Sequence, residues 1–97
     1  MFIHGVLFVV NPKEVVKYRK DSLMWARHAQ KSSGFLDYRT LKRYGHKDQY
    51  VSVYQWVKKI DHDRFMRKHH DWLVRKSKAK VKVLDYYNFK QLDSLRR

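Results

Sequence analysis

Only three glycines and one proline interrupt this chain of 97 residues, so its helices and strands have few places to end. Residues 2–10 are mainly β-branched or aromatic and are apolar at both alternating positions, which predicts a strand buried on both faces. Residues 11–14, Asn-Pro-Lys-Glu, have the residue types of a helix start. An apolar arc then predicts a helix to about Ser32, which Gly34 ends.

The rest of the chain predicts a hairpin, a second helix and a last strand. Residues 45–48 form the predicted turn of the hairpin, and Asp61 or Asp63 is placed to cap the helix. The predicted elements are strands at 35–44 and 50–57, a helix from His62 to about Lys76, and a strand at 80–89. This order is that of the ferredoxin-like α+β fold, a four-stranded antiparallel sheet with two helices on one face. We expect one domain over residues 1–89 and a basic C-terminal tail, or short terminal helix, over residues 90–97.

Charge is the strongest signal in the composition. The chain has 23 lysines and arginines against 9 acidic residues, a formal net charge of +14. Ten of the basic residues lie between residues 58 and 82, on the second predicted helix and the connector after it. Such a charge attracts anions, whether nucleic acid, a membrane surface or an anionic small molecule, and does not select among them. The chain has no cysteine, which excludes disulfides, thiolate nucleophiles and cysteine-ligated metal centres.

The apolar segments are short. The longest apolar run, residues 6–10, is far below the roughly 20 residues that cross a bilayer. The first ten residues have neither the basic start nor the small-residue cleavage site of a signal peptide. We therefore expect a cytoplasmic protein with no membrane partner.

Three groups of residues, taken in order, resemble a known family. They are Gly34-Phe35 at the start of the second predicted strand, Tyr50-Val51 leading to Trp56 in the third, and Phe65 followed by His69 in the second helix. Over residues 2–89 this order resembles the antibiotic-biosynthesis monooxygenase (ABM) superfamily. The resemblance implies a dimeric α+β barrel, in which the sheets of a homodimer face each other. It also implies a pocket between each sheet and its helices.

The resemblance implies an activity as well. Members of the superfamily oxidise aromatic polyketides without a metal or prosthetic group, or degrade haem. This chain would then be a small-molecule monooxygenase that acts on a planar aromatic or haem-like ligand, with no cofactor or with haem. The haem-degrading members use an Asn on the first strand, a Trp and an iron-ligating His. Gly5 or Val6 stands where the Asn is expected and no His follows a Trp at the family's spacing, so this triad is not reproduced.

Seven residues are candidates for the site. We predict His69 and Trp56 as catalytic residues, and His70, Tyr54, Trp72, Tyr38 and Phe8 as ligand-binding residues. His69 shares the apolar face of its helix, where an imidazole could ligate haem iron or transfer a proton near neutral pH. The alternative is a histidine at the rim of the core or in solvent. The aromatic residues predict a flat slot for a planar ligand, or else core and dimer interface.

Two other histidines carry weaker patterns. His4 lies within the first predicted strand and could contact a ligand if it points inward, although a structural role is the simpler interpretation. His62 lies two helical turns before His69, and the side chains of adjacent His69 and His70 diverge by about 100°. This spacing does not suit a metal ion, so we predict no metal site.

Two other classes of function remain open at this stage. The RNA-recognition motif has the same order of elements, and Phe8, Tyr50 and Tyr54 could form a platform on which bases stack. The third predicted strand lacks the glycines of that motif's signature, however. The alternatives to an enzyme are therefore a basic nucleic-acid-binding module with a ferredoxin-like fold, or a non-catalytic ligand-binding dimer.

Overall fold

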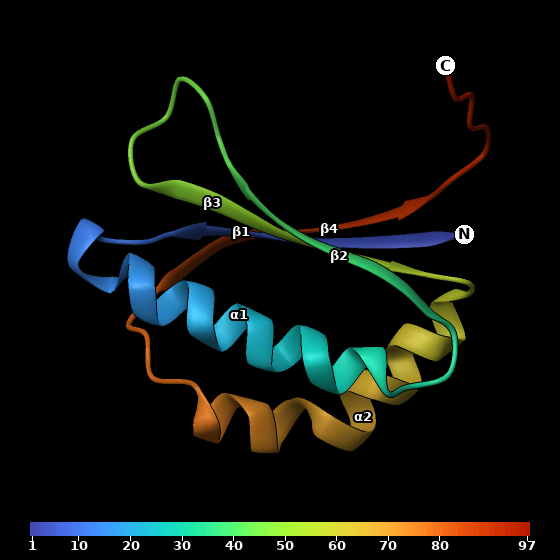
Figure 1. The fold of residues 1–97 in the computed structure, drawn as a ribbon, viewed down its shortest axis with the longest axis horizontal. Helices are drawn as coiled ribbons and strands as arrows, with labels where there is room; N and C mark the ends of the chain where they lie inside the picture. Colours follow the sequence, from blue (N-terminus) through green and yellow to red (C-terminus); the bar gives the residue numbers. More distant parts are fainter.

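The computed structural model describes all 97 residues, and it contains four strands and two long helices (Figure 1). The elements are β1 (Phe2–Val9), the 3-10 helix η1 (Pro12–Glu14), α1 (Val15–Gln30), β2 (Phe35–Lys42), β3 (Gln49–Trp56), α2 (Lys59–Lys76) and β4 (Lys82–Lys90). The predicted order of strands and helices is confirmed. No helix in the chain combines the length and the apolar character that a bilayer crossing requires.

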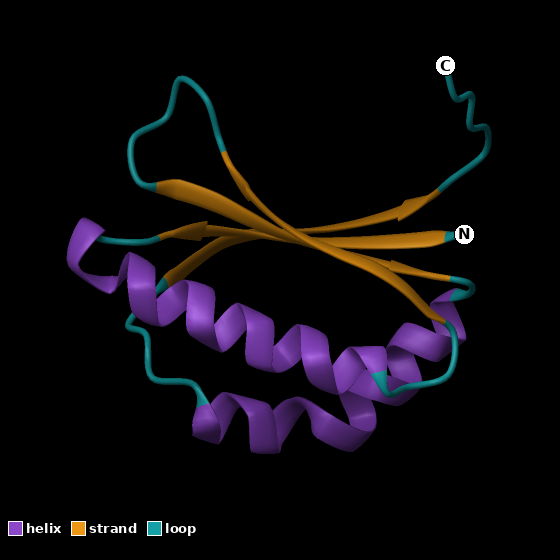
Figure 2. Ribbon diagram, viewed as in Figure 1, coloured by secondary structure: helices purple, strands orange, loops and turns teal.

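The four strands form one antiparallel sheet in the order β2-β3-β1-β4, and α1 and α2 both lie against the same face of it (Figure 2). The predicted ferredoxin-like α+β fold is therefore confirmed. Strand β1 is central and apolar at nearly every position, but the helices cover only one of its two faces, so the predicted burial on both faces is met within the chain on one face alone. A register shift between Leu7 and Phe8 marks a bulge in its pairing with β4.

The helix starts differ from the predicted ones. Asn11 caps the short η1, because its side chain accepts the N–H of Lys13 at 3.0 Å, and α1 begins only at Val15. Helix α2 begins at Lys59, three residues before the predicted start. Asp61 caps it from inside the first turn, where its carboxylate accepts the N–H of Lys58 at 3.1 Å. The tail after β4 forms no helix.

The loop between α1 and β2 depends on Gly34. This residue has a φ of +86°, in the left-handed region that favours glycine. A Cβ added here would also collide with the side chain of Asp61. The Gly34 carbonyl accepts the N–H of Val57 at 2.8 Å, so the loop ties the start of β2 to the end of β3. The Gly34-Phe35 pair of the family resemblance therefore has a steric reason in this chain.

The core lies between the sheet and the two helices. It is formed by Phe2, Ala29, Tyr54, Trp56, Phe65 and Leu73. Trp56 and Leu73 are fully buried, and Phe35 meets the Trp56 ring edge-on at a centroid distance of 5.5 Å. Burial of such side chains contributes about 1.5–3 kcal/mol each, which makes this cluster the main source of stability for the helix layer.

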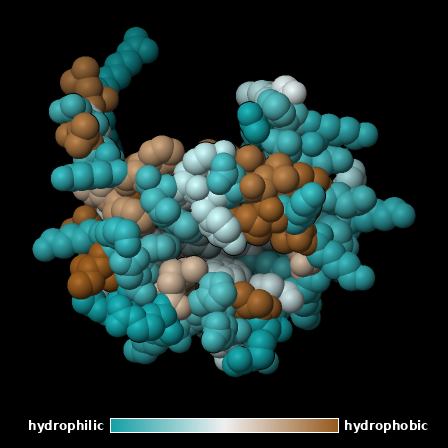
Figure 3. Space-filling view, turned by 180° about the vertical axis from the view of Figure 1, so that it is seen from behind, coloured by the Kyte–Doolittle hydropathy of each residue, from teal (hydrophilic) through white to brown (hydrophobic).

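The opposite face of the sheet has no helix over it. The pairing register places on this face the side chains of Ile3, Leu7, Leu41, Val51, Val53, Tyr87 and Phe89. The rings of Tyr87 and Phe89 stack at a centroid distance of 6.1 Å, and Phe89 is 55% exposed. Viewed from behind, apolar atoms gather between two projections, the C-terminal tail and the β2–β3 hairpin (Figure 3). An exposed apolar face of this kind is typical of a surface that another molecule covers.

Candidate active site

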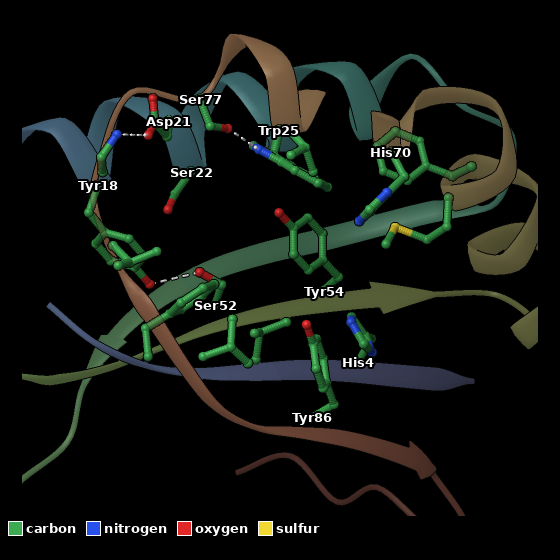
Figure 4. A pocket seen from close by; sticks show the side chains of 18 of the residues that line it. His4, Tyr18, Asp21, Ser22, Trp25, Ser52, Tyr54, His70, Ser77 and Tyr86 are labelled. Carbon is green, nitrogen blue, oxygen red and sulfur yellow. Dashed lines mark hydrogen bonds between the residues drawn. The ribbon is translucent and has the colours of Figure 1, made fainter. Parts of the chain in front are cut away.

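A cavity of about 370 Å³ lies between the sheet and the helices. Its walls come from β1, β3 and β4 on one side and from α1, α2 and residues 77–81 on the other (Figure 4). Thirteen of its 20 lining residues are hydrophobic, and several of these are aromatic. This volume falls in the range of roughly 300–1,000 Å³ that small-molecule pockets occupy. The pocket implied by the family resemblance is therefore present in this chain.

One end of the cavity carries linked hydroxyl groups. The hydroxyls of Tyr18 on α1 and Ser52 on β3 are hydrogen-bonded at 2.8 Å. Behind them, the Tyr38 hydroxyl donates to Ser52 Oγ at 3.2 Å and lies 2.7 Å from Thr40 Oγ1. Burial raises the pKa of Tyr18 to about 12 and the pKa of Tyr54 well above its ordinary value. Both phenols therefore stay protonated and can donate hydrogen bonds at neutral pH.

A pair of histidines lies at another part of the wall. The rings of His4 on β1 and His62 on α2 are 4.4 Å apart between centroids. The His4 Nδ1 lies 2.8 Å from the side-chain oxygen of Asn88 on β4. Burial lowers the pKa of both imidazoles, that of His62 to about 4. Both rings are therefore neutral at pH 7.

The connector between α2 and β4, residues 77–81, is here called the strap, and three of its residues line the cavity. Two carboxylates, Glu14 of η1 and Asp21 of α1, accept hydrogen bonds from its backbone N–H groups. Asp21 accepts the N–H groups of Lys78 at 2.9 Å and Ala79 at 2.8 Å, and Glu14 accepts that of Lys80 at 2.7 Å. The Trp25 indole N–H donates to the Ser77 hydroxyl at 2.9 Å. The strap is therefore a wall of the cavity fastened by side chains rather than by sheet pairing.

The interior of the cavity has little charge, although the chain as a whole carries +14. No lysine or arginine lines it. The one carboxylate in the lining, Asp21, is engaged by the strap. The positive charge therefore acts from the outer surface, while the groups that would touch a ligand are aromatic rings, hydroxyls and neutral imidazoles.

The seven predicted site residues separate into two groups. Trp56, His70, Tyr54 and Phe8 line the cavity. Three others lie outside its lining. His69 packs against Phe65 and His28, and Trp72 packs on His28 and is 40% exposed. Tyr38 lies behind the lining residues Ser52 and Tyr54, which it contacts. Because His69 and His70 are adjacent on a helix, only one of them can face the cavity, and it is His70.

The structure adds residues that the sequence patterns do not single out. His4 points inward and lines the cavity, which was the weaker of its two interpretations from the sequence. His62 also lines the cavity and packs against the His4 ring. Tyr18 and Ser52 supply the hydroxyl end, and Asn88 positions His4 from the neighbouring strand. Period-two alternation already places His4 and Ser52 on the same faces as Phe8 and Trp56.

The structure does not offer the base-stacking platform that the sequence left open as an alternative. Phe8 and Tyr50 both contact the ring of Tyr18, at centroid distances of 5.3 and 5.7 Å, and Tyr18 belongs to α1. Tyr54 is buried in the core below the same helix layer. These three rings therefore point at the helices and cannot receive a row of nucleic-acid bases.

Comparison with known proteins gives results at the level of structure alone. No protein-family model matches the sequence, and no curated protein matches it. A solved structure similar to this one is SnoaB from Streptomyces nogalater, described as a cofactor-independent oxygenase. It is 14% identical over 99% of this chain and 97% of that one, with a TM-score of 0.76. The chain has the fold of the antibiotic biosynthesis monooxygenases.

Two further structures agree with this fold. One is a putative antibiotic biosynthesis monooxygenase from Deinococcus radiodurans, 12% identical over 99% of this chain and 97% of that one, with a TM-score of 0.75. The other is a variant of MhuD with two manganese protoporphyrin IX molecules bound per active site. It is 13% identical over 99% of each chain, with a TM-score of 0.79. The predicted ABM resemblance is thus confirmed as a fold.

Proposed function

We propose that the protein is an ABM-type monooxygenase that works without a cofactor on a planar, uncharged aromatic molecule held in the cavity. The observation that carries the proposal is the cavity itself, an apolar and aromatic space of about 370 Å³ with hydroxyl groups at one end and no cation in its lining. Such a lining favours a flat hydrocarbon body and lets a few polar groups fix its orientation. The fold shared with SnoaB, a cofactor-independent oxygenase, supports the same chemistry.

The proposed reaction uses molecular oxygen as the oxidant. A CH₂ group between two aromatic rings of the ligand becomes a carbonyl group, one oxygen atom enters the ligand, and the other leaves as water. The ligand supplies all four electrons, so no other reductant is needed. In this reaction the protein binds and orients the ring system, excludes bulk water, and provides hydrogen bonds to the oxygen on which negative charge develops.

The residues of the cavity suit these tasks. The rings of Tyr54 and Trp56 offer flat surfaces against which an aromatic ligand can lie. The Trp56 indole N–H is buried in the core and makes no hydrogen bond, so Trp56 offers the ligand its ring surface rather than a donor. Hydroxyl donors come from Tyr18 and Ser52 at the other end.

Haem is the second candidate ligand, and one observation favours it. His70 on α2 lines the cavity, where its imidazole could ligate iron, and the fold is shared with MhuD, which binds a manganese porphyrin. The rest of the lining fits haem less well. Haem carries two propionates, and the cavity has no lysine or arginine to pair with them. We therefore assign the cavity to an uncharged ligand and derive no step through haem.

We also propose that two copies of the chain pair through the uncovered sheet face. This face presents a row of apolar side chains that includes Val51, Val53 and Phe89. A two-fold pairing would place the same patch of each copy against the other and remove both from water.

The proposed function is tested by oxygen uptake with a dihydroxyanthrone as the probe. This molecule is flat and uncharged at neutral pH, and it has the required CH₂ group. We expect one O₂ consumed per quinone formed and one atom of isotopically labelled O₂ in each product molecule. Tyr44→Phe, on an exposed turn residue, is the matched control and keeps full activity. Anthrone oxidation no faster than in buffer, combined with a haemin-dependent Soret shift that His70→Ala abolishes, would overturn the proposal in favour of haem.

A further inference from the structure

His4 is the one histidine of the chain whose ring nitrogen is hydrogen-bonded to a different element, and this partner fixes its tautomer. Its Nδ1 lies 2.8 Å from the Asn88 side-chain oxygen, which can only accept. The hydrogen of the neutral ring is therefore on Nδ1, which donates to Asn88. Nε2 then carries the lone pair and is the atom of His4 that can take up a proton.

This nitrogen is open to the cavity. Nε2 makes no hydrogen bond in the protein. The only side-chain nitrogen or oxygen that is both fully buried and without a partner is the indole nitrogen of Trp56, so Nε2 of His4 is not fully buried. Nε2 is therefore accessible rather than sealed in the core. Figure 4 shows the His4 ring beside Tyr54 and Tyr86 at the base of the cavity, on the side of the sheet that faces the helices.

The groups around His4 favour its neutral form, in which Nε2 can accept a proton. His62 from α2 lies against it, Tyr54 of β3 is 6.5 Å away, and Tyr86 of β4 is 6.3 Å away between centroids. None of these is a carboxylate that would favour an imidazolium before the ligand arrives. Two charged side chains, Lys59 and Asp63, act on the neighbouring His62, and they pair with each other at 2.7 Å.

We propose that Nε2 of His4 takes the proton from a hydroxyl group of the cavity ligand, and that Asn88 is the positioning residue for this transfer. The inference rests on the proposed function and names its substrate class, an aromatic molecule with a phenol or enol hydroxyl. The O–H bond of the ligand breaks and its electron pair stays on oxygen. The N–H bond forms on Nε2, which leaves a phenolate beside an imidazolium whose Nδ1–H still donates to Asn88. No electron is transferred in this step, and the electron-rich phenolate is the form that reacts with O₂.

The first test measures hydrogen bonding without turnover. The probes are naphthol, which has a hydroxyl, and its methyl ether, which has none. In nitrogen NMR of the wild-type protein, we expect the Nε2 resonance of His4 to shift when naphthol binds and to stay in place when the ether binds. Naphthol binding that leaves the Nε2 resonance unchanged would overturn the role of His4, whether or not anthrone is oxidised.

The second test uses variants and the dihydroxyanthrone. His4→Gln keeps a polar side chain but cannot take up a proton, so we expect kcat to fall about 10²–10⁴-fold, the usual contribution of a positioned base. The affinity for the naphthol ether should not change, which shows that the cavity remains intact. His46→Gln, in the exposed turn between β2 and β3, is the matched control with unchanged kcat. If His4→Gln retains wild-type kcat, the proposal fails while the oxygenase function stands.

Asn88→Asp tests the positioning role through a pH profile. A carboxylate at this place stabilises the imidazolium and raises the pKa of His4, whereas the neutral ring is the active form. The acid limb of kcat/KM should therefore move to higher pH than in the wild type. An acid limb that stays in place would show that Asn88 has a structural role only. If the wild-type protein does not oxidise anthrone but naphthol still shifts the Nε2 resonance, the role of His4 as proton acceptor is supported and the proposed oxygenase function is wrong.

Discussion

At the scale of single residues, the polar groups of the cavity are set by burial rather than by ion pairs. Burial raises the pKa of Tyr18 and Tyr54 and lowers that of His4 and His62. All four groups are consequently uncharged at neutral pH. These groups supply hydrogen-bond donors and acceptors without adding charge to the cavity. The cavity therefore favours an uncharged ligand, although the outer surface attracts anions.

The lowered pKa of His62 predicts a loss of stability in mild acid. Its pKa is about 4 in the folded protein against 6.5 ordinarily, so the unfolded chain binds more protons as the pH falls from 6.5 to 4. The free energy of unfolding should fall over this interval by on the order of 1–2 kcal/mol from His62, allowing for solvent at the cavity. His62→Phe removes this contribution, so urea unfolding of the variant at several pH values should show a flatter dependence. His46→Gln, in an exposed turn, should leave the wild-type slope. Equal slopes for wild type and His62→Phe would contradict the assignment.

At the scale of elements, the strap shows how a segment without regular structure can form a wall. Its backbone N–H groups find no strand partner and are instead accepted by carboxylates more than fifty residues earlier in the chain. The strap closes the cavity on one side, and the backbone N–H groups of residues 78–80 are bonded to side-chain carboxylates rather than to backbone carbonyls. Local opening of this segment is therefore the expected route by which a ligand enters.

Asp21→Ala is predicted to loosen the strap. The variant leaves the N–H groups of Lys78 and Ala79 without their acceptor, at a local cost of about 1–3 kcal/mol for hydrogen bonds to a charged group. Amide hydrogen exchange at residues 78–80 should become about 10-fold faster or more, and naphthol should dissociate faster. Asp37→Ala, which removes an exposed carboxylate paired with Arg39, is the control and should change neither rate. Unchanged exchange in Asp21→Ala would show that other contacts hold the strap.

The elements also show which parts of the structure can be predicted from the sequence. Strands and helices were predictable because their apolar periodicity is long and strong, as in residues 2–10. The start of α2 was predicted too late, since Asp61 caps the helix from its third position instead of preceding it. The direction in which each side chain of α2 points was harder to predict. His69 and His70 are adjacent, and packing against α1 decides which of them faces the cavity.

Contacts between distant segments could not be predicted in the same way. Tyr54, Trp56 and Phe8 follow from alternation along a strand. Asn88 meets His4 only because β4 pairs with β1 in a register altered by a bulge, which no local pattern indicates. The bond from Asp21 to the strap likewise joins residues 57 and 58 positions apart. The chemistry of the site depends on these long-range contacts.

At the scale of the whole molecule, the two faces of the sheet have different tasks. One face and the helices enclose the cavity, and the other presents apolar side chains to the outside.

If two copies pair through the outer face, the wild-type protein should sediment at twice the mass of the chain. Phe89→Glu places two like charges in the two-fold interface and should give monomers at micromolar concentration. Val16→Glu, at a 65% exposed position of α1, is the control and should remain dimeric. A wild-type protein that sediments as a monomer would contradict the pairing.

The contrast between the charged surface and the uncharged cavity gives the most direct test of the whole account. Binding of naphthol and of its sulfonate is compared by calorimetry at low and high salt, with the site located by NMR shifts of Tyr54 and Ser52. We predict that naphthol binds in the cavity with an affinity that does not depend on salt, and that the sulfonate binds there at least 10-fold more weakly. Preferential binding of the sulfonate in the cavity, with an affinity that falls steeply as salt rises, would contradict the claim that uncharged residues select the ligand.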